Sequence, residues 1–570
     1  MGRRRAAPSF YPRREARMAA RHHASPGARA RTRTAASRTN VRTRATAKRN
    51  NARTRATSHH TALARSLTSP QIAMIALSGA LGTGLFLGAG ATISLAGPAT
   101  IISYALAGLL ALSVVWALAE MVSAHPVPGG HGTIAGAYLG NLGAFVTRWN
   151  LAVTYIVAVG AEVTAGAKYL QHWLPQLNSA VGTVACSLFI VGLNMATVRL
   201  YGTAEYWFSM IKVAAISVFI LLGLIIIFVG LPASEPVGLV NLTEHGGFMP
   251  LGAGSVFIAA CMAVFSFGGI ETVSVTAAES GNPRYDIPRA AHTMIWRLLL
   301  FYVGAIAVVV AMQPWTVTAE PLHDISQSPF VHALDAAAIP AAGHIMNAVL
   351  LVAALSAANG CLYTSSRMIH ALATDRMAPA FAARTTPKGT PRGAVTLAMV
   401  GMVVACILAL TSPQAGFSYL YGCATVGTLL TWALVMATHI AFRRCRKQLG
   451  LELPSARLWG APVTNLAVMA GCLAIFVALF WLMPVAWYAG LPYLGILLLI
   501  YVFLDRVRGL PAPRDLAGEE AGRGAAASHG GDAARGTEAT HGTEAARGTE
   551  AARNAAAGSE GATTNGVSEN

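Results

Sequence analysis

The stretch IAMIALSGALGTGLFLGAG, residues 72–90, decides the fold of this chain, because it is apolar and yet rich in glycine. It is long enough to cross a bilayer, but a glycine inside a helix costs about 1 kcal/mol relative to alanine. We therefore expect the helix to be interrupted at mid-depth. Irregular backbone at that depth is tolerated only inside protein or beside a watery cavity, and secondary transporters bind substrate at such breaks. One alternative stays open, in which Gly84 and Gly88 only let two helices pack closely.

The composition places the chain in a membrane. Of its 570 residues, 54% are hydrophobic and 12% are charged, which is too apolar for a soluble protein of this length. Nearly all of the net charge of +18 comes from the first 69 residues, which hold 18 Lys or Arg against one acid, Glu15. The seven cysteines show no CxxC or metal-ligand spacing, and no nucleophile–base pattern is present. We expect no metal, no cofactor and no enzymatic activity.

Both ends of the chain differ from its middle. Residues 1–69 are rich in Arg, Ala and Thr without apolar periodicity, and residues 506–570 are rich in Ala and Gly, with a degenerate six-residue repeat at 535–552. We expect two disordered cytoplasmic tails around a transporter domain at 70–505. For the basic tail, nucleic-acid binding, a transit peptide, contact with anionic lipid and a start codon at or after Met18 remain alternatives. A solvated tail without a nucleic-acid partner is the prediction.

Between the tails lie apolar segments long enough to span about 30 Å of hydrocarbon. We expect twelve transmembrane helices, at 71–95, 98–122, 143–170, 179–198, 206–230, 251–276, 291–312, 343–370, 394–411, 417–441, 461–482 and 486–504.

The connections between these segments predict their orientation. Four connections, 231–250, 313–342, 412–416 and 483–485, contain no Lys or Arg. The connections on the opposite side hold Arg199, Arg284, Arg289, Arg376, Arg384, Lys388, Arg392, Arg443, Arg444, Arg446, Lys447 and Arg457. By the positive-inside rule, both termini are cytoplasmic in a multi-pass protein of the plasma membrane.

The sixth segment repeats the pattern of the first. It contains FSFGGIE at 265–271, with paired glycines at mid-depth, and it crosses in the opposite sense. Two glycine-broken helices five spans apart are what a five-plus-five inverted repeat produces, although two unrelated glycine clusters remain an alternative. A break after Gly84 exposes helix amides that attract a carboxylate, with the Thr83 hydroxyl beside them. A break from Phe265 to Gly268 leaves carbonyls that accept from an ammonium.

Several motifs resemble one family. ALSGALGTGLFLGAG, AEYWFSMIKVAAI (204–216), FSFGGIETVSVTAAESGNP (265–283) and SAANGCLYTSSRM are similar to bacterial amino-acid permeases. These belong to the amino-acid-transporter branch of the amino acid–polyamine–organocation superfamily. The resemblance covers about residues 63–505. It implies an all-α membrane protein of the leucine-transporter type, with a 5+5 inverted repeat plus two peripheral helices. It also implies amino-acid uptake coupled to protons.

The resemblance also assigns roles to matching positions. Gly82, Thr83 and Gly84 match the carboxylate-binding break. Phe265 matches an aromatic gate, and the backbone of Phe265, Ser266, Phe267 and Gly268 matches the ammonium site. Glu271 matches an acid associated with gating and protonation, and Lys212 matches a lysine that stands where sodium-coupled relatives hold an ion. The stretch HPVPGGHGT at 125–133 departs from the family pattern and leaves that connection open.

Each charged residue in a predicted span can have a structural role instead of a functional one. Lys212 lies about 9 Å into its span, so snorkelling to the interface is the alternative to proton coupling. Glu162 lies deep in the third span, where an acid is functional by default and a hydrogen-bonded structural role is the alternative. We expect Glu162 and Glu271 to be buried in the bundle. Glu120 is expected to be structural, and Arg367 is expected to pair with an acid or a lipid phosphate. His125 and His131 are expected in a solvated loop.

The sequence thus predicts a secondary transporter that imports an amino acid by proton symport. Its partners are an amino acid, a proton and the lipid bilayer, and the sequence indicates no oligomeric state. An exchanger and a non-transporting amino-acid sensor remain alternatives. Substrate selectivity is expected from side chains around Ser356 and Asn359, or on spans three and ten. The absence of a lone charge in these stretches favours a neutral or aromatic amino acid.

Overall fold

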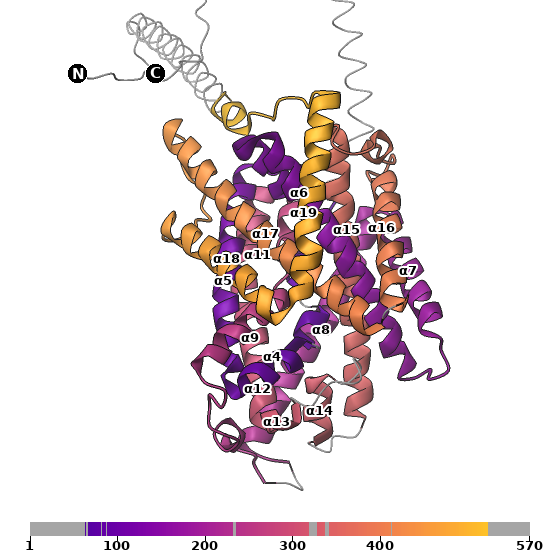
Figure 1. The fold of residues 1–570 in the computed structure, drawn as a ribbon, viewed down its shortest axis with the longest axis vertical. Helices are drawn as coiled ribbons and strands as arrows, with labels where there is room; N and C mark the ends of the chain where they lie inside the picture. Colours follow the sequence, from indigo (N-terminus) through magenta and orange to yellow (C-terminus); the bar gives the residue numbers. More distant parts are fainter. Residues whose placement is uncertain are drawn as a thin grey trace, which may run out of the picture. The chain divides into compact units, whose positions relative to one another are not determined.

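The computed structural model describes residues 63, 66–80, 82–86, 88–231, 235–318, 328–336, 341–411 and 413–522. Over these residues the fold is helical. The β-structure among them is one isolated β-bridge, between Leu67 and Ser280. Figure 1 shows the helices as a bundle. The long helices outside the first and sixth spans are α5 Thr100–Ala124, α6 Gly130–Gln171, α7 Ser179–Met195, α8 Val198–Phe228, α11 Pro283–Leu298, α12 Ala305–Met312, α15 Ala342–Thr374, α16 Arg392–Thr411, α17 Pro413–Gln448, α18 Val463–Leu482 and α19 Pro484–Arg508.

Eight helical stretches among the described residues are long and apolar enough to cross a membrane, so the chain is an all-helical, multi-pass membrane protein. Three apolar helices are shorter, at Ser179–Met195, Ala253–Ser266 and Arg392–Leu408. Each of the twelve predicted segments overlaps one or more helices in the structure. The count of twelve spans and the inverted repeat stay predictions, because length and composition alone identify eight.

The first span is interrupted, as the glycines of residues 72–90 predict. Helix α2 covers Ser69–Ala80, α3 covers Thr83–Phe86 and α4 covers Gly88–Ala96. The interruption in the described residues therefore lies at Gly82, before Thr83, and not after Gly84 as predicted. At Gly82 a Cβ would lie 3.2 Å from the Glu162 carboxylate and 3.2 Å from Ala357 Cβ. This close approach of α6 and α15 leaves little room for a side chain at position 82.

The sixth span is interrupted as well. Helix α9 covers Ala253–Ser266 and α10 covers Thr272–Thr276, with a turn at 267–271 between them. Gly269 has φ +106°, a conformation that residues with a Cβ rarely adopt. The break thus begins two residues later than the predicted 265–268, because its geometry depends on Gly269 and the helix continues through Phe265 and Ser266.

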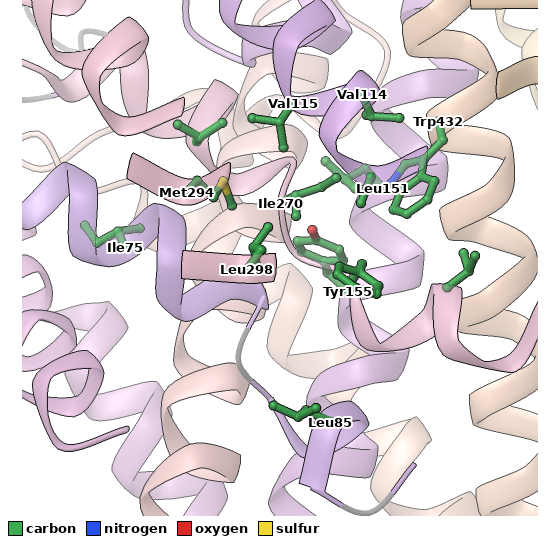
Figure 2. Packing of buried hydrophobic residues seen from close by; sticks show 14 of the residues in the cluster. Ile75, Leu85, Val114, Val115, Leu151, Tyr155, Ile270, Met294, Leu298 and Trp432 are labelled. Atoms are coloured by element: carbon green, nitrogen blue, oxygen red, sulfur yellow. The ribbon is translucent and has the colours of Figure 1, made fainter. Parts of the chain in front are cut away.

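Helix α6 lies at the centre of the packing. It contacts α7, α15, α16 and α17, and its buried side chains include Leu151, Tyr155 and Val159. Figure 2 shows Leu151 and Tyr155 near Ile270 of the sixth-span turn and Trp432 of α17. The contact with α17 is close: a Cβ at Gly427 would lie 1.9 Å from Thr154 Oγ1. Helices α18 and α19 are mostly exposed, with apolar side chains that suit contact with lipid.

The described residues extend into both predicted tails. Leu67 is buried and its amide donates to the Glu279 carbonyl at 3.2 Å. At the other end, α19 continues to Arg508 and residues 509–522 are described, with helix at 516–522. The domain limits at 69 and 505 stay a prediction, although described residues lie on both sides of each limit. Residues 1–62 and 523–570 lie outside the described residues, so disorder there remains a prediction.

The stretch 125–133 is not a solvated loop, which corrects the prediction for its histidines. His125 and His131 are 3% and 1% exposed. A ring nitrogen of His125 lies 2.8 Å from the Tyr138 hydroxyl, and His131 Nδ1 lies 2.7 Å from Ser274 Oγ. Helix α6 begins within the stretch, at Gly130, so these side chains turn into the bundle.

Candidate functional site

The two interrupted helices meet in the interior. Ser266 Oγ, at the end of α9, donates a hydrogen bond of 2.7 Å to the Gly84 carbonyl in α3. A Cβ at Gly84 would lie 3.1 Å from Ser266 Cα and 3.4 Å from the Phe265 ring. Glycine at position 84 therefore permits the contact between the first and sixth spans.

A small cavity of about 50 Å³ lies where these segments meet. Six of the residues singled out in the sequence line it: Gly82, Gly84, Glu162, Phe265, Ser266 and Gly268. Helix α6 adds Thr154 and Tyr155, and α17 adds Ala424 and Thr428. The cavity is bounded by backbone, hydroxyl groups and one carboxylate as well as by small apolar side chains.

Glu271 lies directly beside this cavity, after the sixth-span break. It is 1% exposed. Its Oε2 accepts from the Tyr155 hydroxyl at 2.7 Å and from the Gly269 amide at 3.0 Å. Its Oε1 accepts from the Trp432 indole N–H. Three neutral donors from α6, the break itself and α17 thus hold this carboxylate.

Glu162 is 8% exposed, so both acids are buried within the bundle and that prediction is confirmed. Glu162 reaches the first-span break, where its Oε1 lies 3.2 Å from the position of a Cβ on Gly82. Arg367 pairs with an acid, as expected: its Nε lies 3.0 Å from Glu279 Oε1, and both side chains are buried.

The sixth-span carbonyls are partly engaged. The Phe265 carbonyl accepts from the Gly268 amide at 2.9 Å, and the Ser266 carbonyl accepts from the Tyr302 hydroxyl at 2.7 Å. The Phe267 side chain is not directed to the cavity but is fully buried, with its ring stacked on Tyr302 at a centroid distance of 4.5 Å. Of the four predicted residues, Phe265, Ser266 and Gly268 line the cavity and Phe267 does not. The side chain of Thr83 lies outside the described part of the chain.

Ser356 and Asn359 are in a different place from the one predicted. Ser356 Oγ donates to Glu205 Oε1, and Asn359 Nδ2 donates to Glu205 Oε2 at 2.6 Å. The residues of α15 that line the cavity are instead Ala357 and Cys361. Ser356 and Asn359 thus bind a carboxylate of α8, on a neighbouring face of α15.

Lys212 is fully buried and does not snorkel to the surface. Glu205 and Glu162 lie close enough to interact with it electrostatically. No role for Glu205 was predicted from the sequence, although its spacing from Lys212 indicates one. It precedes Lys212 by seven residues, or two helical turns, so both side chains lie on one face of α8.

Tyr155, Trp432 and Thr428 were also missed, because nothing in their own segments distinguishes them from ordinary core residues. Among the described residues, no group of three or more His, Cys, Asp or Glu side chains is placed to hold a metal ion. The titratable side chains of the site are therefore Glu162, Glu271 and Lys212, with Glu205 beside them.

Comparison with known proteins agrees with the motifs. The chain is 36% identical over 395 residues to the aromatic amino acid transport protein AroP of Salmonella typhimurium, covering 69% of this chain and 85% of the relative. It is 35% identical over 394 residues to the protein of that name in Escherichia coli K12, with the same coverage. It is 34% identical over 413 residues to the gamma-aminobutyric acid permease of Bacillus subtilis, covering 72% of this chain and 87% of the relative.

The family model for amino acid permeases matches residues 71–508, which include both interrupted helices, the cavity between them and every titratable residue of the site. The chain therefore belongs to the amino acid permease family, whose members are transporters and not enzymes.

Proposed function

We propose that this protein imports an amino acid across the plasma membrane as a secondary active transporter, by symport with protons. The observation that carries the proposal is the cavity between the two interrupted helices. It places exposed backbone groups and the buried Glu162 carboxylate in one small space. Backbone that is irregular at membrane depth and surrounds a cavity is the arrangement in which transporters bind small charged groups.

In this proposal the backbone recognises the two charges common to amino acids. The amides at the start of α3, at Thr83 and Gly84, bind the carboxylate. The ammonium binds at the sixth-span turn, where Phe267 and Gly268 offer carbonyls and Phe265 covers the substrate. Since Phe265 and Ser266 carbonyls already accept hydrogen bonds within the protein, the ammonium site is centred one to two residues later than the sequence predicts.

A neutral or aromatic amino acid is the proposed substrate. Ala158, Ala357 and Ala424 line the cavity with small apolar groups, which suit an uncharged side chain once the cavity widens around the substrate. Two of the relatives bear names that refer to aromatic amino acids and to gamma-aminobutyric acid. Neither name implies a substrate with net charge, which agrees with a site that binds one carboxylate and one ammonium.

Proton coupling is assigned to Lys212, with Glu271 and Glu162 as the other proton-binding groups. Lys212 is buried beside acids near the first-span break. When protonated, its ammonium bridges the first and eighth spans, and when neutral it releases them so that the first span moves. Twelve spans, an inverted repeat and cytoplasmic termini belong to the same proposal, since basic residues gather at one end of the predicted bundle.

Reconstitution in liposomes tests the proposal. Purified protein in vesicles with no internal substrate is expected to accumulate labelled phenylalanine when the inside is alkaline, and a protonophore is expected to abolish this accumulation. Uptake only into vesicles preloaded with an amino acid would indicate an exchanger. Binding without uptake would indicate a sensor.

The coupling residue is tested in the same vesicles. Lys212→Met keeps the side-chain volume, removes the titratable group, and is expected to bind substrate but to lose proton-driven accumulation. The matched control is Lys168→Met, in the last turn of α6, which is expected to behave like the wild type. Wild-type accumulation by Lys212→Met would exclude Lys212 and leave Glu271 or Glu162 as the coupling group.

A further inference from the structure

The chain does not leave the bundle where its last membrane helix ends. Gly509 has φ +56° and its amide donates to the Asp505 carbonyl at 3.1 Å, which ends α19 and turns the chain. Residues 509–522, here called the strap, then cross to the ends of other helices. In Figure 1 this yellow segment leaves the end of α19 and reaches the start of α6.

Polar contacts attach the strap at two points. The Pro511 carbonyl accepts from Asn141 Nδ2 of α6 at 3.0 Å. The Glu520 carboxylate contacts Arg446 of α17, at 2.6 Å from Nη1 and 3.3 Å from Nη2. It also lies 3.8 Å from His125 Nε2, directly after α5. The strap thus connects the ends of α5, α6, α17 and α19.

Apolar burial holds the strap between these points. Leu516 and Ala517 are 3% and 4% exposed, and Leu516 belongs to the main hydrophobic core. Asp515 Oδ1 accepts from the Gly518 amide at 2.9 Å, which fixes the local turn of helix. Glu519, on the outside, pairs with Arg514 at 3.1 Å. The strap thus turns Leu516 and Ala517 toward the protein and Glu519 toward solvent, as a docked segment does and a solvated tail does not.

The strap covers a second small cavity that faces the same side of α6 as the candidate site. Pro511, Ala512 and Pro513 line it together with Asn141 and Arg148 of α6. Arg148 precedes Tyr155 by seven residues, so the two side chains share a face of α6 and lie about 10 Å apart along its axis. The strap therefore lies at the end of the α6 face that leads from the candidate site to the basic side of the protein.

We propose that the strap is an autoinhibitory restraint on transport, a proposal that rests on the proposed function. A substrate released at this end requires the helix ends around the second cavity to separate. The strap opposes that separation, because Pro511 binds α6 and Glu520 binds α17 through one continuous segment. Release of the strap raises the rate at which the site opens toward this end, without any change in the residues that bind substrate.

Full-length point variants test the restraint. Glu520→Gln removes the charge that binds Arg446 and His125, and is expected to raise the initial rate of phenylalanine uptake into liposomes about threefold, as for loss of a partly exposed ion pair. Glu519→Gln is the matched control, since it changes the neighbouring exposed acid, and it is expected to keep the wild-type rate. Truncation after Arg508 is expected to act like Glu520→Gln, whereas truncation after Gly522 keeps the strap and the wild-type rate.

Cysteine labelling shows whether the strap is docked, independently of transport. Ala517→Cys is expected to react slowly with a maleimide in the full-length protein, and quickly once Glu520→Gln is added. Ala512→Cys, which is exposed, is expected to react quickly in both. Each is compared with the labelling of the seven native cysteines in the parent protein.

Two results would overturn the proposal. The first is fast labelling of Ala517→Cys in the parent, which means that the strap is not docked. The second is release of the strap in Glu520→Gln, seen by labelling, without a faster uptake rate. A parent protein that does not transport phenylalanine or another amino acid contradicts the proposed function instead, and the labelling still reports whether the strap is docked.

Discussion

Two buried glutamates in this protein are held in opposite ways. Glu271, beside the candidate site, accepts hydrogen bonds from a phenol, an indole and a backbone amide. Glu120, near the end of α5, binds cationic or cation-forming side chains of α17: Arg443 Nε and Nη2 at 2.8 and 2.7 Å, and His439 Nε2 at 3.0 Å. Both carboxylates are at most 1% exposed.

The difference separates a carboxylate held by counter-charges from one held by neutral donors. Neutralising Glu120 leaves Arg443 without its counter-charge in a largely buried place, which is costly. Neutralising Glu271 only weakens hydrogen bonds to groups that carry no charge. Two further ion pairs, Arg367–Glu279 and Arg148–Asp375, resemble the Glu120 cluster. The protein thus keeps compensated charges at its basic end, whereas Glu271 beside the candidate site is held by neutral donors.

The largest effect on stability is expected for Glu120→Gln. It removes the charge that Arg443 and His439 face, and should lower the free energy of unfolding by about 3 kcal/mol. Thermal unfolding in detergent measures this. Glu244→Gln, in an exposed connection, serves as the control and should change stability by less than about 0.5 kcal/mol. A Glu120→Gln protein as stable as the control would remove the distinction drawn between the two acids.

Glu271→Gln is expected to have a smaller effect on stability and a larger one on transport. Its amide oxygen can still accept from Tyr155 and Gly269, but its amide N–H₂ then faces the Trp432 N–H, at a cost of about 2 kcal/mol. Uptake should continue but lose its dependence on external pH between mildly acidic and mildly alkaline buffer. An unchanged pH dependence would assign proton binding to another residue.

Tyr155→Phe should have the smallest effect. It removes one neutral donor to Glu271, while the Gly269 amide still binds the same oxygen, so stability should fall by about 1 kcal/mol. Because the acid remains, uptake should keep its pH dependence. Loss of that dependence in Tyr155→Phe would mean that the hydroxyl itself carries the proton, in contrast to the neutral-donor role inferred for it.

The sequence predicted those features that depend on one segment at a time. Glycine clusters predicted two interrupted helices, and the cost of a charge that faces lipid predicted the burial of Glu162 and Glu271. Features that depend on which faces meet were not predictable. Ser356 and Asn359 lie in the expected span but face Glu205, and their neighbours Ala357 and Cys361 face the cavity. A rotation of α15 by about 100°, the angle between successive residues, decides between these outcomes, and a single sequence contains no signal for that rotation.

At the ends of the described chain, too, the sequence did not predict contacts between distant segments. The composition of residues 506–570 predicts a polar tail, and the apolar pair Leu516 and Ala517 is too short to contradict it. The docking of the strap is explained by residues of other helices, such as Arg446 of α17 and Asn141 of α6, which bind it. His125 and His131 likewise look like loop residues until Tyr138 and Ser274 are seen to face them.

The close contact at Gly427 limits how the specificity of this protein can be redesigned. Thr154 lines the cavity, and Gly427 stands behind it without room for even a methyl group. A bulkier residue at position 154 therefore cannot retreat and has to extend into the substrate space, which favours smaller substrates. A wider pocket must instead come from shortening another residue that lines the cavity, such as Thr428 of α17. Substitutions that admit larger amino acids are thus expected at lining residues other than Thr154.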